Sequence, residues 1–299
     1  MARSPAASRR RLGVELRGLR EAADKRIEDA AAALECSTAK ISRLETGKGV
    51  PYARDVRDLA TLYGDGAKAK LGELLELAED GRAQEWYGAY RDVLQGDQMA
   101  DHLVRLYELE RDTTEMKLFE TDLIPGLLQS ERYIDAVCSI VAPHYSEKER
   151  ARFVEFRQKR QDEVLRGKEH PDLSFIVSEL AITRLVGGRE VMRHQLASLH
   201  ADLTGRLGSV DFRIVPLEAE ARGALGGPFA ILKFARSDDQ DLVYLEGREG
   251  ATWLETDGEV NRYEGFFSGL ERESLSRSAS LDRLTQAVER LTQEVEELV

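Results

Sequence analysis

The sequence predicts an α+β fold: an all-α N-terminal domain, a helical region joined to a small, mostly antiparallel sheet, and a C-terminal amphipathic helix. Apolar residues recur every three or four positions up to about residue 165, and this spacing returns after residue 278. Between these segments lie short β-branched or aromatic runs, which are the predicted strands: Leu173–Ser178, Val210–Val215, Ala230–Phe234 and Leu242–Leu245. The expected domain boundaries are 1–78, 79–277 and 278–299.

Four or five short helices are predicted in the N-terminal domain. Leu12, Leu16 and Leu19 place one apolar stripe on a first helix that ends near Ala23. A later run of apolar residues gives a helix that stops at Gly64. Four or five helices in about 65 residues is the size of a small helical module.

Residues 37–48 form the most informative stretch of this domain. Ser37 is placed to cap a helix, and Gly47 follows as its stop signal. Ile41 and Leu44 fall at helical spacing on the inner edge. The opposite edge is therefore polar, basic and exposed.

A second short helix, Ile27–Leu34, precedes this one across a two-residue break at Glu35-Cys36. Two short helices joined by a tight turn make a helix-turn-helix, whose second helix is built to enter the major groove of DNA. If the backbone at Glu35 needs a positive φ, the position favours Gly, and a non-Gly residue there costs about 1 kcal/mol.

The outward side of the second helix carries the predicted base contacts, Thr38, Ala39 and Arg43. Arg43 can donate two hydrogen bonds to guanine, and Ala39 can contact a thymine methyl group. Phosphate contacts, which fix orientation without reading sequence, are expected from Arg26, Ser37, Lys40, Lys48 and Arg54. Two side chains are expected to act inside the domain: Glu45, paired with an arginine such as Arg17 or Arg20, and Ser42, by packing.

Charge is divided unevenly along the chain, whose net charge is −12. Residues 1–60 carry 13 Lys/Arg against nine Asp/Glu, so residues 61–299 carry a net charge of −16. This asymmetry places the phosphate-binding surface at the N-terminus. Residues 1–8 are expected to form a disordered arm, with Arg9–Arg11 able to reach a DNA backbone or minor groove; a merely solvated basic start is the alternative.

The middle domain is expected to be helical from Arg82 to Leu165, with a helix starting at Gly126. Further helices are predicted at Arg189–Leu203 and Val260–Leu270. Two sets of polar residues leave alternatives open. Arg157, Arg160 and Gln161 either hold an anionic group or pair with nearby acids, which an acidic domain favours. Glu179 and Glu246 either cap strand ends or line a ligand pocket near Tyr244 or Trp253.

A heptad pattern closes the chain at positions Leu281, Leu284, Val288, Leu291, Val295 and Leu298. Branched residues at position a and Leu at position d favour a parallel two-stranded coiled coil, so this helix is a candidate dimerisation element. The alternative is an amphipathic helix folded against its own domain, because fewer than three heptads are marginal alone.

A series of motifs resembles one family of regulators. The N-terminal domain contains Arg17–Arg20 (RGLR), Ser37–Gly47 (STAKISRLETG) and Asp55–Gly64 (DVRDLATLYG). The remainder contains Pro125–Gln129 (PGLLQ) and Val243–Glu246 (VYLE), in order. Together they resemble xenobiotic-response-element (XRE) helix-turn-helix regulators, in particular the WhiJ-type and antitoxin-like branch of high-GC bacteria. The resemblance implies transcription control and a small partner protein, often encoded nearby.

Composition and motifs narrow the function further. No phosphate-binding loop, dinucleotide fingerprint, nucleophile elbow or zinc-protease motif occurs. We expect no catalytic residue, metal site or cofactor, and hence not an enzyme. Lacking an 18-residue apolar run or signal region, the chain is expected in the cytoplasm, without a membrane partner. The expected partners are double-stranded, near-palindromic operator DNA, a second copy of the chain in a homodimer and a small protein. A metabolite-gated regulator and an enzyme with a DNA tether are the alternatives.

Overall fold

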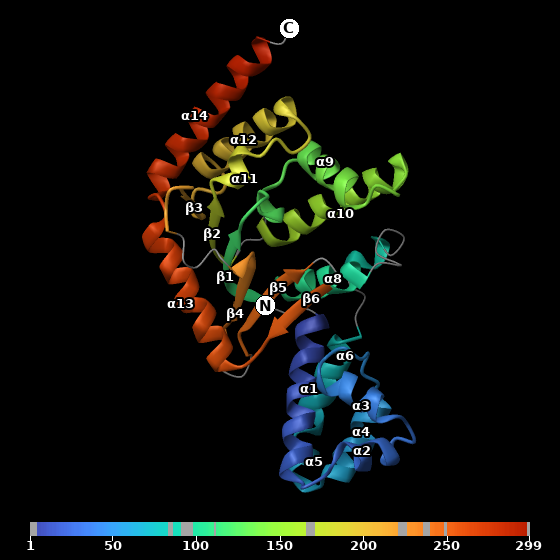
Figure 1. Ribbon diagram of the computed structural model, residues 1–299. Helices are drawn as coiled ribbons and strands as arrows, with labels where there is room; N and C mark the ends of the chain where they lie inside the picture. Colours follow the sequence, from blue (N-terminus) through green and yellow to red (C-terminus); the bar gives the residue numbers. More distant parts are fainter. Residues whose placement is uncertain are drawn as a thin grey trace. The chain divides into compact units, whose positions relative to one another are not determined.

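The computed structural model describes residues 5–82, 86–90, 98–110, 112–165, 171–220, 226–235, 240–247 and 250–297. The chain divides into two compact units, coloured along the sequence in Figure 1. Unit 1 comprises Met1–Ala89 and Val104–Asp112, and unit 2 comprises Tyr90–Leu103 and Thr113–Val299.

Unit 1 is built from short helices around one apolar core. Leu12 and Leu16 pack with Ile41, Leu59 and Leu74, all with at most 1% of their surface exposed. These contacts join helices that are far apart in sequence, so the unit is held by burial of one stripe from each helix. Its helices are α1 (Pro5–Ala22), α2 (Ile27–Ala33), α3 (Thr38–Glu45), α4 (Ala53–Tyr63), α5 (Asp65–Ala69) and α6 (Leu71–Asp80). The 3₁₀ turn η1 (Trp86–Tyr90) and helix α8 (Gln98–Glu110) follow, each with residues in both units.

From Pro5 onward the structure shows a helix and not the predicted disordered arm, because α1 begins at that residue. The guanidinium of Arg9 donates to the carbonyl of Gly81 at 3.1 Å and pairs with Glu108 at 2.9 Å. Arg11 pairs with Glu15 at 2.6 Å. These arginines are therefore occupied inside unit 1, and the prediction for residues 5–11 was wrong.

Unit 2 contains a six-stranded mixed sheet in the order β3-β2-β1-β4-β5-β6, which confirms the α+β class. The pairings β1–β2 and β2–β3 are parallel, and the three from β1–β4 to β5–β6 are antiparallel. In register, Phe119 lies beside Ile176 on one side and Phe229 on the other. The strands are β1 (Thr113–Glu120), β2 (Asp172–Ser178), β3 (Asp211–Val215), β4 (Phe229–Phe234), β5 (Leu242–Gly247) and β6 (Gly250–Leu254).

Strand β1 corrects the prediction that the region from Arg82 to Leu165 is helical, with breaks only at Gly96, Pro125-Gly126 and Pro143. It lies in the middle of the sheet and buries Met116 and Phe119 completely. A strand buried on both faces loses the alternation that marks a half-exposed strand. The three-residue step from Met116 to Phe119 then resembles a helical step.

Helices pack against the sheet and against one another. Helix α13 (Asp257–Glu273) covers the face that carries Phe119, Ile231 and Val243, through Phe267 and Leu270. On the other side of the strands lie α9 (Glu131–Val141) and α10 (Glu147–Leu165), green in Figure 1. The expected helix at Gly126 is instead a short 3₁₀ turn, η2 (Gly126–Leu128), and α9 begins only after Ser130. The short α11 (Leu180–Thr183) and α12 (Arg189–Thr204) follow β2.

The C-terminal helix α14 (Arg277–Glu296) packs against α12 of its own unit. Leu284 and Leu291, at the d positions, have at most 1% of their surface exposed there. The a positions Leu281, Val288 and Val295 are half-buried, whereas Leu298 lies outside the described residues. The arrangement found is thus the intramolecular alternative, and the d positions are not available for a zipper seam between two copies.

Polar contacts fasten the start of α14 to the edge of the sheet. The Oγ of Ser280 accepts from the amide of Ile214 at 3.0 Å, and the amide of Leu275 donates to the carbonyl of Ile214 at 2.9 Å. The guanidinium of Arg277 donates to the carbonyls of Leu203 and Val210, at 2.7 and 3.1 Å. Edge strand β3 is thereby covered, which blocks pairing with another chain.

Candidate nucleic-acid interface

The turn between α2 and α3 has the geometry of a Schellman motif. Glu35 has φ +49°, as the sequence allowed, and its amide donates to the carbonyl of Ala32 at 3.1 Å. The next amide, of Cys36, donates to the carbonyl of Ala31 at 2.9 Å. These are the two hydrogen bonds that end a helix around a left-handed residue. The side chain of Ser37 then caps α3 by accepting from the amide of Lys40 at 3.3 Å.

Helix α3 lies with its apolar edge in the core and its polar edge exposed. Ile41 and Leu44 are buried, whereas Thr38, Ala39 and Arg43 are exposed. No described residue forms an ion pair with the guanidinium of Arg43. The structure therefore presents the three predicted base-contacting side chains together on one accessible edge.

The C-terminal end of α3 is fixed to α1 by an ion pair and a close backbone approach. Arg20 pairs with both oxygens of Glu45, at 2.6 and 3.0 Å, so of the two predicted partners of Glu45 it is Arg20 that binds. The hydrogen bond to Glu45 raises the pKa of Arg20. A Cβ at Gly13 would lie 2.5 Å from the carbonyl oxygen of Glu45, so only glycine lets the two helices touch there. The expected packing of Ser42 was wrong, because that residue is exposed.

The residues predicted at DNA phosphates surround this edge in different states. Arg26 and Lys48 are exposed, and so is Arg54, which makes a long 3.6 Å contact with Asp58. Lys40 instead pairs with Asp55 of α4 at 2.6 Å. The hydroxyl of Ser37 is used for the helix cap although the residue is exposed. Arg26, Lys48 and Arg54 can therefore contact a phosphate without breaking a short ion pair, whereas Lys40 cannot.

A recess of about 390 Å³ lies beside the exposed edge of α3. Lys40, Arg43 and Lys48 line it together with Val50 and Tyr52 of the α3–α4 loop, which are 56% and 50% exposed. Sequence reasoning did not select these two. The sequence pattern that could have identified them is two large apolar residues on either side of a proline, in a loop between basic residues. Such residues are more commonly buried against the neighbouring helices.

The polar residues singled out in the C-terminal part do not form one site. Glu179 pairs with Arg283 and accepts from the amide of Leu217 at 3.1 Å, whereas Glu246 lies one residue before the end of β5. Strands β1 and β4 lie between β2 and β5, so the ends of β2 and β5 are about 14 Å apart. The hypothesis that Glu179 and Glu246 share a pocket near Tyr244 or Trp253 was therefore wrong.

Glu246 instead lies near Glu120, whose carboxyl group is shielded from solvent although part of the residue is accessible. Burial, followed by the charge of Glu246, raises the pKa of Glu120 to about 8, and the charges of Arg157 and Arg160 oppose the rise. The charges of the two arginines thus act on a buried acid, and their pairing with acids stays a prediction.

Three glutamines hold the loop around η2. Gln161 donates to the carbonyls of Gly126 and Gln129, at 2.9 and 2.8 Å. Gln129 in turn donates to the carbonyl of Ile124 at 2.8 Å, and Gln195 of α12 donates to the carbonyl of Leu128 at 2.9 Å. Gln161 is therefore a structural residue and not an anion ligand.

Comparison with known families agrees with this geometry. Residues 11–67 match a helix-turn-helix domain, and the chain is thus a DNA-binding regulator of the helix-turn-helix class. Residues 103–286 match the Domain of unknown function (DUF5753), and the chain belongs to this family. Neither the curated proteins nor the solved structures gave a match. None of the described helices combines the length and hydropathy that a membrane crossing requires. The described residues hold no group of three or more His, Cys, Asp or Glu placed to bind a metal ion.

Proposed function

We propose that this chain is an XRE-type transcription regulator that reads a near-palindromic operator as a homodimer, in the cytoplasm where operator DNA is found. The observation that carries the proposal is the edge of α3, where Thr38, Ala39 and Arg43 are exposed on a helix fixed by the Arg20–Glu45 pair. A single helix reads few base pairs, so two half-sites about 34 Å apart supply the remaining discrimination.

In this proposal unit 2 receives the signal and catalyses no reaction. The resemblance to WhiJ-type and antitoxin-like regulators supports a small protein as that signal. The alternative is a metabolite-gated regulator. A groove of about 830 Å³ in unit 2 supports this alternative, because sites for small ligands have about this volume. A thermal-shift screen of metabolites against the full chain separates the two, because only the alternative predicts a stabilising small molecule.

The DNA-binding proposal is tested by selecting duplexes with the purified chain and measuring affinity by fluorescence anisotropy. Arg43→Ala is expected to weaken binding to the selected duplex by about 1–3 kcal/mol and to relax one base position. Lys48→Ala is expected to weaken binding to all duplexes alike. Lys68→Ala on α5 is the matched control and should leave both affinities unchanged. An Arg43→Ala variant that binds selected and random duplexes as the parent does would contradict the assignment of the reading edge.

A further inference from the structure

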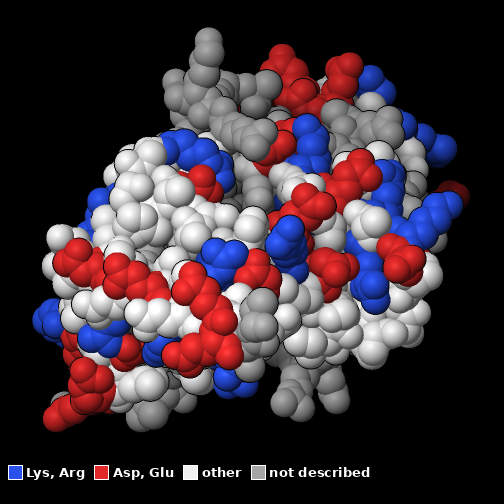
Figure 2. All heavy atoms as spheres, turned by 90° about the horizontal axis from the view of Figure 1, so that it is seen from above, with Lys and Arg blue, Asp and Glu red and all other residues white. Residues whose placement is uncertain are grey.

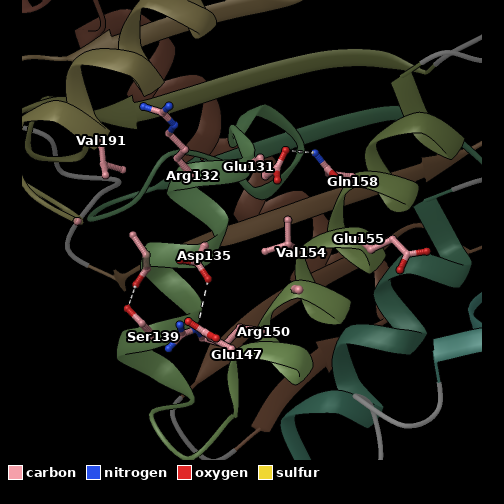
Figure 3. A pocket seen from close by; sticks show the side chains of 13 residues that line it. Glu131, Arg132, Asp135, Ser139, Glu147, Arg150, Val154, Glu155, Gln158 and Val191 are labelled. Atoms are coloured by element: carbon pink, nitrogen blue, oxygen red, sulfur yellow. Dashed lines mark hydrogen bonds and ion pairs between the residues drawn. The ribbon is translucent and has the colours of Figure 1, made fainter.

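A groove runs between α9 and α10, with the start of α12 at its side; we call it the α9–α10 groove (Figure 3). Its lining residues on α9 are four apart (Glu131, Asp135, Ser139), and those on α10 are three or four apart. One face of each helix therefore lines the groove. On α10 the lining extends from Glu147 to Gln158, about 16 Å or three helical turns.

The apolar residues that line the groove are mostly small. They are Ala136, Ala151 and Gly187, together with Val154 and Val191. A Cβ at Gly187 would lie 2.7 Å from the Cβ of Ala136, so the backbone before α12 comes as close to α9 as it can. Small residues on a helix pair leave room for the side chains of a third element.

Apolar side chains are also exposed at the C-terminal end of α9. Ile140, four residues after the lining residue Ala136, and Val141 are each 65% exposed. Exposed apolar side chains of this size beside a groove with a polar rim are typical of protein contact sites.

The rim of the groove is acidic. Its carboxylates are Glu131, Asp135, Glu147 and Glu155, against the guanidinium groups of Arg132 and Arg150. Glu155 pairs with Arg152 at 2.6 Å. Arg150 is taken up by Asp135 at 3.3 Å, as the dashed line in Figure 3 shows. Figure 2 shows one face of the molecule, on which acidic and basic side chains are interspersed. Glu131 and Glu147 have no ion pair among the described residues, so these two carboxylates favour a basic occupant.

We propose that the α9–α10 groove binds a basic amphipathic helix of a partner protein. Its apolar stripe would lie against the alanine and valine residues of the lining, with Lys or Arg side chains beside Glu131 and Glu147. This is helix-in-groove recognition, read by residues at i, i+3/i+4 and i+7. A small molecule is usually enclosed on most sides, whereas here the charged groups extend along three turns. The inference rests on the proposed function in one respect, that unit 2 receives a protein signal.

The test uses two labelled synthetic 16-residue helical peptides with the same Ala/Leu stripe, one flanked by Lys and one by Glu. Each is titrated with the full chain by fluorescence anisotropy. The Lys peptide is expected to bind at least tenfold more tightly than the Glu peptide. Ala151→Trp, which fills the groove from an exposed helical position, should weaken the Lys peptide at least tenfold. Ala201→Trp, at an exposed alanine of α12 outside the groove, should leave it unchanged. The double variant Glu131→Lys, Glu147→Lys should reverse the preference between the peptides.

Equal binding of the two peptides, or equal effects of the two tryptophan variants, would overturn the proposal. So would a metabolite whose stabilisation of the chain is abolished by Ala151→Trp. Binding of the selected DNA duplex is measured in parallel and should be the same for Ala151→Trp and the parent. If the parent chain binds no DNA duplex, the proposed function is refuted. The peptide titrations would still show whether the α9–α10 groove binds a basic helix.

Discussion

The left-handed backbone at Glu35 predicts that glycine at this position stabilises unit 1. Glu35 has φ +49°, is exposed, and its side chain makes no hydrogen bond or ion pair with any described residue. Glu35→Gly therefore removes a steric penalty of about 1–2 kcal/mol. The greater freedom of Gly in the unfolded chain takes back about 0.4–1 kcal/mol. The net expectation is a stabilisation of unit 1 by up to about 1.5 kcal/mol.

The matched control is Ala32→Gly, three residues earlier at an exposed position inside α2. There Gly has no steric penalty to remove and should destabilise the helix by about 1 kcal/mol. Scanning calorimetry of the full chain measures both. In a domain of 60–100 residues, 1 kcal/mol corresponds to roughly 4–8 °C. Hydrogen exchange of peptides from residues 27–45 assigns the transition to unit 1. Two shifts of the same sign would refute the argument from backbone conformation.

Three further predictions follow from packing and charge. Gly13→Ala should destabilise unit 1 by about 1–3 kcal/mol and weaken DNA binding, because the added Cβ meets the backbone of α3. The control is Gly18→Ala on the same helix, where an added Cβ has no atom within 4 Å. It should stabilise unit 1 by about 0.5–1 kcal/mol in the same calorimetric scan. Because the pKa of Glu120 is about 8 in the folded chain, against its ordinary 4.5, unit 2 should lose stability as pH rises from 4.5 to 8, and Glu120→Gln should flatten that profile in urea titrations at several pH values. Leu284→Ala should destabilise unit 2 by about 2–5 kcal/mol, independently of protein concentration; a concentration-dependent loss would indicate a seam between two copies.

Much of unit 1 could be predicted from the sequence because its signals are local. The cap at Ser37, the apolar spacing of Ile41 and Leu44, and the strained turn at Glu35 each depend on a few neighbouring residues. The pairing partner of Glu45 was narrowed to two arginines but not to one. That choice depends on how α1 crosses α3, which Gly13 permits and no local pattern records.

The predictions that failed depend on contacts between distant segments. Strand β1 is a strand because β2 and β4 pair with it, and burial on both faces removed its alternation. The helix that begins at Pro5 carries Arg9, whose partners Gly81 and Glu108 are 72 and 99 residues away in the sequence. In α14 the heptad spacing serves equally for a partner helix in another chain or for α12 in the same one, so periodicity alone could not choose.

The ion pair between Lys40 and Asp55 has a consequence for how tightly the regulator is held at different ionic strengths. Each phosphate neutralised by a protein cation releases condensed counterions, and log affinity falls by about 0.9 per contact with log salt. The ammonium group of Lys40 already lies 2.6 Å from the carboxylate of Asp55. Its approach to a phosphate would therefore release few counterions from the DNA. The proposed dimer would therefore respond to salt as though it had two fewer lysines than its surface displays, and would stay bound over a wider range of cellular salt.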